Sequence, residues 1–338
     1  MVAVLPGCGG TVGGPAVTNA TGGSNGSNGA GGVTSTGGAS GSGGAINQGG
    51  AGGDDVGVGG AASGGAPGSG GAPASNPDGS VDSGPPATTG GTKVVMYLPN
   101  WSGSFASWAT KMDFKKMTHL NLSFGTVKSN VWSLGAADAD VKTLVDAAHA
   151  AKVKVLVSIG GADDDIGIIN SYATAANIDP LVTSLDAFVT RLDLDGVDVD
   201  LERGAMMKSS GNFPAFLKAL IAKLRPEGKL ITSALAQYIV EDAGSDATIT
   251  AWLNSYDFIN LMIYSTNMTT YTKELTWWTT TKMVPKANLT WGVEFSSKLT
   301  VDIAKQLTTA SEAYGGVMLW EYSQGTEAQL WPAVQGSI

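Results

Sequence analysis

Three acidic side chains alternate along one short apolar stretch of the chain. In "DGVDVDLE", Asp198, Asp200 and Glu202 are two residues apart, with a valine or leucine between them. Successive side chains of a strand point to opposite faces, so the three carboxyl groups share one face, each about 6.6 Å from the next. Like charges raise one another's pKa, and a carboxyl group that stays protonated near neutral pH can act as a general acid. The spacing therefore indicates acid catalysis or a carboxylate-bound cation.

The number of histidines and cysteines in the chain restricts which metal ion such a row of acids could bind. The chain has two histidines, His119 and His149, and one cysteine, Cys8. Zinc sites use histidine and cysteine ligands, so a zinc site is disfavoured. Mg²⁺ or Ca²⁺ held by the three acids stays open as an alternative to catalysis. We expect no cofactor and no metal.

Eight short apolar segments follow residue 92 and predict strands. They are residues 93–98, 118–124, 153–159, 195–201, 229–235, 257–264, 288–295 and 315–322. Amphipathic helical patterns lie between several of them, at 141–148, 185–192, 216–224 and 303–314, and Asp179-Pro180 predicts a helix N-cap. The alternation favours an α/β fold with a single (β/α)₈ barrel. An open doubly wound sheet is the alternative, but no Gly-x-Gly-x-x-Gly turn follows the first segment.

The barrel gives the acid row a position. The row lies on the fourth predicted strand and runs toward its C-terminal end, where barrel enzymes carry their active sites. A row of acids in the packed middle of a barrel would be costly without polar partners. We therefore expect Glu202 at the mouth of the barrel and Asp198 deepest.

Residues 1–92 differ sharply in composition from the rest. They hold 32 of the 48 glycines and no lysine, arginine or aromatic residue. Such a segment has little to bury, so we predict a long disordered Gly/Ser/Ala-rich linker before a catalytic domain at residues 93–338. Cys8, in "AVLPGCGG", is similar to a bacterial lipoprotein cleavage site, and a stray cysteine in a disordered tail is the alternative. The lipoprotein interpretation predicts a secreted or cell-surface protein with a lipid tether to a membrane.

Charge excludes one class of partner. Residues 93–338 carry 25 acids against 20 bases, and no basic patch is visible in the sequence. Nucleic-acid-binding domains carry clustered positive charge. We expect a monomer that does not bind nucleic acid.

The acid row also resembles a known family. "DGVDVDLE" fits the Asp-x-x-Asp-x-Asp-x-Glu signature of family 18 glycoside hydrolases, which include chitinases and endo-β-N-acetylglucosaminidases. Three further family motifs follow in order: Ser-x-Gly-Gly at 158–161, Met-x-Tyr at 262–264 and a tryptophan in "GGVMLWEY". The opening "VVMYLPNW" is similar to the family's first strand. The resemblance covers nearly all of the chain from residue 93 onward.

The resemblance implies a role for each acid. Glu202 is expected to protonate the leaving oxygen of a glycosidic bond. The substrate's own 2-acetamido oxygen attacks the anomeric carbon, Asp200 supports the acetamido N–H, and Asp198 shares a proton with Asp200. The three acids would then titrate as a coupled set.

Aromatic and polar side chains at strand ends are the expected sugar contacts. Tyr264 would donate its hydroxyl to the acetamido oxygen, and Trp320 would form an apolar floor beneath the sugar. Packing is the alternative role for both. Further substrate contacts are expected from Tyr97, Trp101, Tyr238, Met262 and Ser265.

The sequence departs from the family at three places. Ser265 stands where the family has an aspartate that helps to bind the acetamido sugar, and "ADDD" follows Ser-x-Gly-Gly where many chitinases have a tryptophan. Residues 296–314 leave no room for the extra α+β insertion of many processive chitinases, which favours an open groove and cleavage within the polymer. Trp277 and Trp278 either line this groove or pack on an amphipathic helix.

We therefore expect a retaining hydrolase that uses substrate assistance to cleave β-1,4-linked N-acetylglucosamine polymers. Such an enzyme degrades polysaccharides as part of carbohydrate metabolism. An endo-β-N-acetylglucosaminidase acting on N-glycans is one alternative. A sugar-binding lectin on an inactive scaffold is another, and the presence of Glu202 argues against it.

Overall fold

The structure is a computed structural model that describes residues 92–162, 165–207, 211–244, 247–294 and 313–322, with residues 300, 302, 303, 305, 306 and 309. Residues 1–91 and 323–338 lie outside the described part. The predicted linker and Cys8 therefore stay predictions. No helix in the described part is long and apolar enough to cross a membrane.

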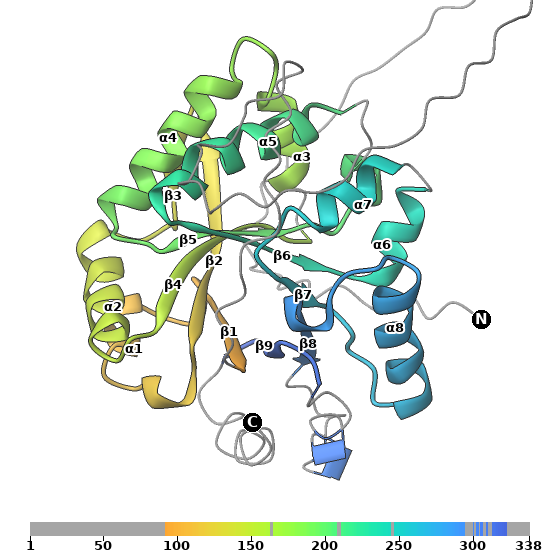
Figure 1. Cartoon of the computed structure of the whole chain (residues 1–338). Coiled ribbons are helices and arrows are strands. Elements are labelled where there is room, and N and C mark those ends of the chain that lie inside the picture. Colours follow the sequence, from red (N-terminus) through yellow and green to blue (C-terminus); the bar gives the residue numbers. More distant parts are fainter. Residues whose placement is uncertain are drawn as a thin grey trace, which may run out of the picture. The chain divides into compact units, whose positions relative to one another are not determined.

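Eight parallel strands form a closed ring (Figure 1). They are β1 (Lys93–Pro99), β2 (His119–Lys128), β4 (Lys154–Gly160), β5 (Gly196–Asp200), β6 (Leu230–Leu235), β7 (Ile259–Leu261), β8 (Leu289–Glu294) and β9 (Gly316–Trp320). Each pairs with the next in this order, and β1 pairs with both β2 and β9, which closes the ring. The predicted (β/α)₈ barrel is confirmed, and the open sheet is excluded.

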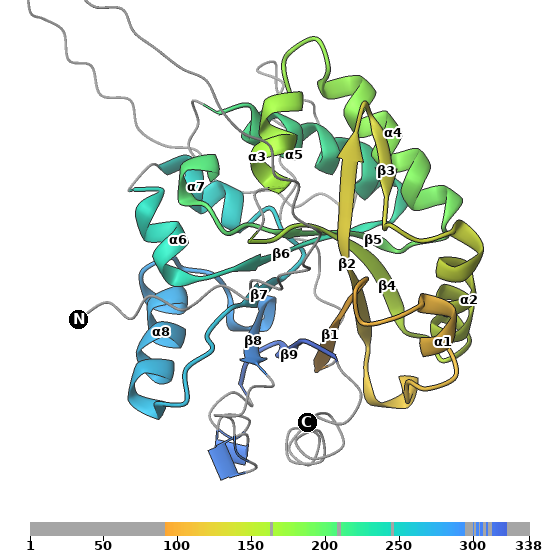
Figure 2. The ribbon, with the colours of Figure 1, turned by 180° about the vertical axis from the view of Figure 1, so that it is seen from behind.

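Helices surround the ring, as opposite views of the ribbon show (Figures 1 and 2). They are α1 (Phe105–Trp108), α2 (Asp138–Ala150), α3 (Asp165–Tyr172), α4 (Ile178–Arg191), α5 (Asn212–Leu224), α6 (Gln237–Asp242), α7 (Ala247–Leu253) and α8 (Met268–Thr280). The predicted apolar stripe of α4, with Leu185, Phe188 and Val189, is buried against the strands. On α8, Trp278 is fully buried and Trp277 packs partly buried against the same core, as an amphipathic helix requires.

Two local features differ from the predictions. Helix α4 has Asn177 as its N-cap, so Asp179 lies inside the first turn rather than capping it. A short strand, β3 (Val131–Ser133), pairs antiparallel with the end of β2. The connecting residues Ser129 and Asn130 both have positive φ, which suits a tight hairpin. Three residues are too few for an alternating pattern to reveal a strand.

The interior of the ring has an apolar part and a polar part. Val95, Tyr97, Ala234, Phe258 and Met318 form the apolar cluster, with Met262 and Trp320 packed against it. The polar side chains that are fully buried are Asn121, Ser123, Ser158, Asp198, Thr232, Ser233, Asn260 and Thr290. Most of them come from inward-facing positions near the middle of neighbouring strands, where they surround the acid row.

Candidate active site

Asp198 lies at the centre of the polar interior and is fully buried. Its Oδ2 accepts hydrogen bonds from the Tyr97 hydroxyl and from Ser158 Oγ, both at 2.8 Å. Its Oδ1 accepts from Thr232 Oγ1 at 2.5 Å and from Asn260 Nδ2 at 3.2 Å. Burial raises the pKa of Asp198 above its usual value, and these hydrogen bonds offset only part of that rise. Strands β1, β4, β6 and β7 thus each supply one donor to the carboxylate on β5.

Asp200 lies one step nearer the mouth and has a different environment. It is 4% exposed, and its Oδ1 has no hydrogen-bond partner among the described residues. Burial, followed by the charges of Glu202 and Asp198, raises the pKa of Asp200 well above its usual range. The pKa of Asp200 is therefore raised further than that of Asp198.

Glu202 follows the end of β5 and is half-buried, whereas the two aspartates are buried. Two tyrosines lie close enough to feel its charge. The pKa of Tyr238, on α6, is raised by partial burial and then by Glu202 and Asp200. The pKa of Tyr264, just past β7, is raised by loss of hydration and then by Asp200 and Glu202. Both hydroxyl groups are therefore neutral hydrogen-bond donors around the acids at physiological pH.

Aromatic rings gather on the opposite side of the mouth. The Trp320 ring centroid lies 5.7 Å from that of Tyr97, 5.9 Å from Phe124 and 6.4 Å from Trp101. Trp320 ends β9, which is four strands from β5 in either direction around the ring. Trp101 is 61% exposed, so its ring is available to a ligand. The acids and the rings thus face each other across the mouth.

Three residues that were predicted to contact the sugar instead contact other residues of the protein. Tyr97 is 1% exposed and donates its hydroxyl to Asp198, so it supports the acid row from below. Met262 is half-buried against the apolar cluster inside the ring. Ser265 Oγ accepts a hydrogen bond from the Asn267 amide at the start of α8. Tyr238, Tyr264, Trp101 and Trp320 remain as side chains exposed or half-buried around the mouth.

Ser158-Ile159-Gly160-Gly161 joins β4 closely to the acid row. Gly160 pairs with Asp200 in the sheet, and the Gly161 amide donates to the Asp200 carbonyl at 3.0 Å. Gly161 has φ +95°, and a Cβ there would lie 2.9 Å from the Phe124 ring. A larger residue is excluded by both conformation and space. The glycines therefore let the backbone lie close beside Asp200.

No group of three histidine, cysteine, aspartate or glutamate side chains in the described part of the chain is placed to hold a metal ion. The acid row itself does not form such a group. Asp198 already accepts a hydrogen bond at each of its lone-pair positions, which leaves it little capacity to ligate a cation.

The sequence pattern of glycosyl hydrolases family 18 matches residues 93–314. The chain belongs to this family. It is a glycoside hydrolase, and the acid row of β5 is its signature motif.

Solved chitinase structures share the fold of this family 18 hydrolase. A family 18 chitinase from the chitin utilization locus of Flavobacterium johnsoniae is 22% identical, with a TM-score of 0.61, over 73% of this chain and 93% of that chain. A family 18 chitinase from Pseudoalteromonas aurantia is 20% identical, with a TM-score of 0.60, over 73% of this chain and 100% of that chain. A Rhizomucor miehei chitinase is 18% identical, with a TM-score of 0.59 and the same coverage. Among curated proteins, none matches the chain.

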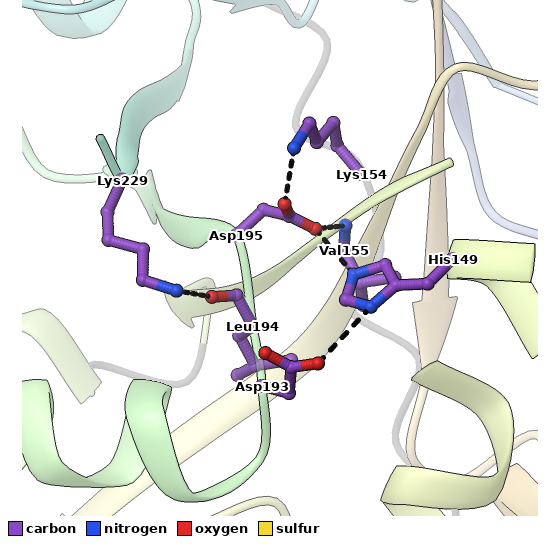
Figure 3. Close-up of polar contacts among 7 residues, drawn as sticks. All are labelled: His149, Lys154, Val155, Asp193, Leu194, Asp195 and Lys229. Atoms are coloured by element: carbon purple, nitrogen blue, oxygen red, sulfur yellow. Dashed lines mark hydrogen bonds and ion pairs between the residues drawn. The ribbon is translucent and has the colours of Figure 1, made fainter. Parts of the chain in front are cut away.

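The first acid of the family 18 signature, Asp195, lies at the opposite end of β5 from the mouth. Lys154 Nζ, at 2.7 Å, and the Val155 amide, at 2.8 Å, donate to it, and His149 Nε2 lies 2.8 Å from its Oδ2 (Figure 3). Partial burial raises the pKa of Asp195, but these hydrogen bonds together lower it below its usual value. At Gly196 a Cβ would collide with the Leu230 backbone. Both residues therefore serve the structure of this end of the barrel.

Several residues of the family 18 site were not recognised in the sequence. Thr232, Asn260 and Thr290 lie inside apolar strands, and Phe124 lies near the middle of β2. A buried strand that carries one polar residue at its centre is a usable signal, because an unpaired polar group there is costly. Without the ring closure, however, that signal does not say which partner the polar group meets.

Proposed function

We propose that this family 18 hydrolase cleaves β-1,4-linked N-acetylglucosamine polymers of the chitin type, at internal bonds and with retention of configuration. The observation that carries the proposal is the unequal pair on β5, where Asp200, whose pKa is raised well above its usual range, lies between hydrogen-bonded Asp198 and half-buried Glu202. The substrate class is also supported by the chitinase structures that share the fold.

The position of Asp200 favours an internal nucleophile. In most retaining glycosidases a second carboxylate attacks from across the sugar, about 5–5.5 Å from the acid. Asp200 instead stands beside Glu202 on the same strand, which is poorly suited to grip the opposite face of a ring. In the proposed reaction Asp200 accepts the acetamido N–H, and Tyr264 donates to the acetamido oxygen. That oxygen forms a bond to the anomeric carbon as the glycosidic bond breaks.

Glu202 is proposed to act twice. It first gives its proton to the leaving glycosidic oxygen as the acetamido oxygen attacks. It then takes a proton from water as the water oxygen bonds to the anomeric carbon and the acetamido group is released. The two displacements together leave the anomeric configuration unchanged.

The aromatic side of the mouth supports binding of a sugar chain. Trp320 would carry the sugar at the cleavage position, and exposed Trp101 would extend the platform toward the next sugars. Tyr238 is 64% exposed and would contact the chain beside the acids. Endo cleavage is supported by the short connection between β8 and β9, residues 295–315, which is too short for an additional cleft-forming domain.

Product analysis on two substrates tests the proposal. Chitin hexamers and a high-mannose glycoprotein are incubated with the enzyme, and the products are separated by mass spectrometry. We expect the hexamer to give mixed dimers, trimers and tetramers, and the glycoprotein to stay intact. Release of the N-glycan with no cleavage of chitin oligomers would replace the proposed substrate with N-glycans.

A further inference from the structure

An acidic side chain lies next to the aromatic floor of the mouth. Glu294 is the last residue of β8 and pairs with Trp320 at the end of β9. Thr290, four residues earlier on β8, donates a hydrogen bond to a buried amide inside the ring, so the alternation of the strand turns Glu294 inward as well. Trp291 and Val293, at the positions between, belong to the core that packs against the helices. Glu294 and Trp320 therefore face the same opening from neighbouring strands, which lie about 4.8 Å apart.

The charge of Glu294 acts on its neighbours at the mouth. Glu294 is exposed, and no other described residue forms a hydrogen bond or an ion pair with it. Partial burial and then the charge of Glu294 raise the pKa of Glu321, just past β9. Burial, then the charges of Asp200, Glu202 and Glu294, raise the pKa of Tyr264. The part of the mouth beside β8 and β9 thus carries two acids and, among the described residues, no base that pairs with either.

The barrel interior below Glu294 is apolar. Gly292 is the next residue down on the inner face of β8, and a Cβ there would collide with the Leu261 carbonyl oxygen. Its partner on β9 is Met318, which belongs to the apolar cluster inside the ring. Neither residue has a side chain that donates a hydrogen bond. A donor to the Glu294 carboxylate therefore has to come from the open end of the barrel.

Asp200 gives independent evidence that a ligand with hydrogen-bond donors fills the mouth. Its Oδ1 is buried, yet no described residue donates a hydrogen bond to it. A buried acceptor without a donor costs free energy, so the donor comes from a ligand or from water. In the proposed reaction that donor is the acetamido N–H. Glu294 is three strands away from Asp200 in the ring, so it is left for a second nitrogen of the sugar chain.

A sugar with a free amino group supplies the charge that an exposed carboxylate attracts most strongly. Removing the acetyl group from N-acetylglucosamine gives glucosamine, whose 2-amino group takes up a proton and becomes an ammonium ion. Hydrogen bonds between charged partners are roughly twice as strong as those between neutral ones. The sugar at the cleavage position must keep its acetyl group, because its acetamido oxygen attacks in the proposed reaction. The ammonium group therefore belongs to a neighbouring sugar of the same chain.

We propose that Glu294 is a specificity-determining residue that binds the ammonium group of a glucosamine residue bordering the N-acetylglucosamine at the cleavage position. The preferred substrate is then partly deacetylated chitin rather than fully acetylated chitin. The inference rests on the proposed function, because it names the sugar that lies beside the cleavage position. It adds no covalent step to the reaction.

Binding of a glucosamine tetramer tests the charge contact without any cleavage. This ligand has no acetamido group and so no internal nucleophile, and its binding to the full chain is measured by calorimetry. We expect Kd to rise roughly threefold in Glu294→Gln and roughly tenfold in Glu294→Lys, with smaller differences at high salt, as for an exposed charge pair. The control is Glu227→Gln, an exposed acid just before β6 at the other end of the barrel. An unchanged Kd in Glu294→Lys would overturn the inference, whatever polymer the enzyme cleaves.

Sequencing the products from partly deacetylated chitin tests the preference itself. The wild type, Glu294→Gln and Glu227→Gln digest the same polymer, and mass spectrometry reads the sugars on both sides of each cleaved bond. We expect N-acetylglucosamine at every new reducing end and, in the wild type, glucosamine enriched at a residue bordering it. The enrichment should fall roughly threefold in Glu294→Gln and persist in Glu227→Gln. Cleavage of chitin with no enrichment in the wild type would overturn this inference and leave the proposed function standing.

Discussion

Asp198 and Asp200 are chemically identical and two residues apart, yet the barrel gives them different environments. Asp198 receives four hydrogen bonds from four strands, whereas Asp200 is buried between two other carboxyl groups. Different environments shift the pKa values of neighbouring carboxyl groups apart, so that one group can act as an acid and another as a base. The third acid, Glu202, is the most exposed of the three.

Replacing Glu202 tests the role of this residue. Glu202→Gln keeps the shape of the side chain but has no proton to give to the leaving oxygen. We expect kcat on chitin oligomers to fall by roughly 10²–10⁴-fold, the usual value of general acid catalysis. The matched control is Glu227→Gln, since Glu227 is an exposed partner of Lys223 after α5. An unchanged kcat in Glu202→Gln would remove Glu202 from the mechanism.

At the scale of elements, the end of the barrel opposite the mouth holds strands and helices together by charge. Asp195, just before β5, binds the start of β4 and the His149 side chain of α2 (Figure 3). His119, at the start of β2, contacts the Phe258 ring with a centroid separation of 5.1 Å. Burial, then the charge of Lys93, lowers the pKa of His119 to about 4.

The lowered pKa of His119 predicts a pH dependence of stability. Unfolded histidine has a pKa near 6.5, so between about pH 6.5 and pH 4 the unfolded chain binds more protons than the folded chain. The contribution is complete above pH 6.5 and is lost as the pH falls through this window. We expect His119 to account for a loss of about 3 kcal/mol in the free energy of unfolding, as an upper figure.

Urea unfolding of the wild type and of His119→Gln at pH 7.5 and pH 4.5 measures this contribution. The raised pKa of Asp200 changes stability in the opposite direction over part of the range, so the quantity to compare is the difference between the two proteins. The wild type should lose more stability on acidification than the variant. Equal losses in both proteins would show that His119 does not titrate in this window.

The eight barrel strands could be predicted from sequence because a parallel strand is buried on both faces and reads as an apolar run. The segment predicted at 195–201 is β5 at 196–200, for example. β7 is shorter than its apolar run, three residues instead of eight, because the chain leaves the ladder after Leu261. An apolar run therefore predicts that a strand is present, but it does not predict at which residue the hydrogen bonding to the neighbouring strands ends.

The candidate site was partly predictable for a similar reason. The acids of β5 are separated by two residues, so local periodicity alone puts them on one face. Tyr97 was expected to touch sugar, but ring closure places it beneath Asp198, 101 residues away in sequence. Asn260 meets Asp198, and Thr290 meets Asn260, only through strand order. Contacts between residues so far apart in the sequence form only when the ring of strands closes. No local sequence pattern specifies that closure.

At the scale of the whole molecule, the ring places acids and aromatic rings on opposite sides of one mouth. β5 carries the acids and β9 carries Trp320, with Tyr264 past β7 between them. A sugar resting on Trp320 would present its acetamido group to Asp200 and Tyr264. The closed barrel, rather than any single element, thus brings together the residues of the proposed substrate-assisted reaction.

The most direct test of this account compares two aryl disaccharides that differ in one group. One carries the 2-acetamido group on the sugar at the cleavage position, and the other carries a 2-hydroxyl there. The account predicts release of the aryl group from the first, with retained configuration, and very slow release from the second, which lacks the internal nucleophile. Efficient cleavage of the 2-hydroxyl compound, or a covalent sugar ester trapped on Asp200, would contradict it.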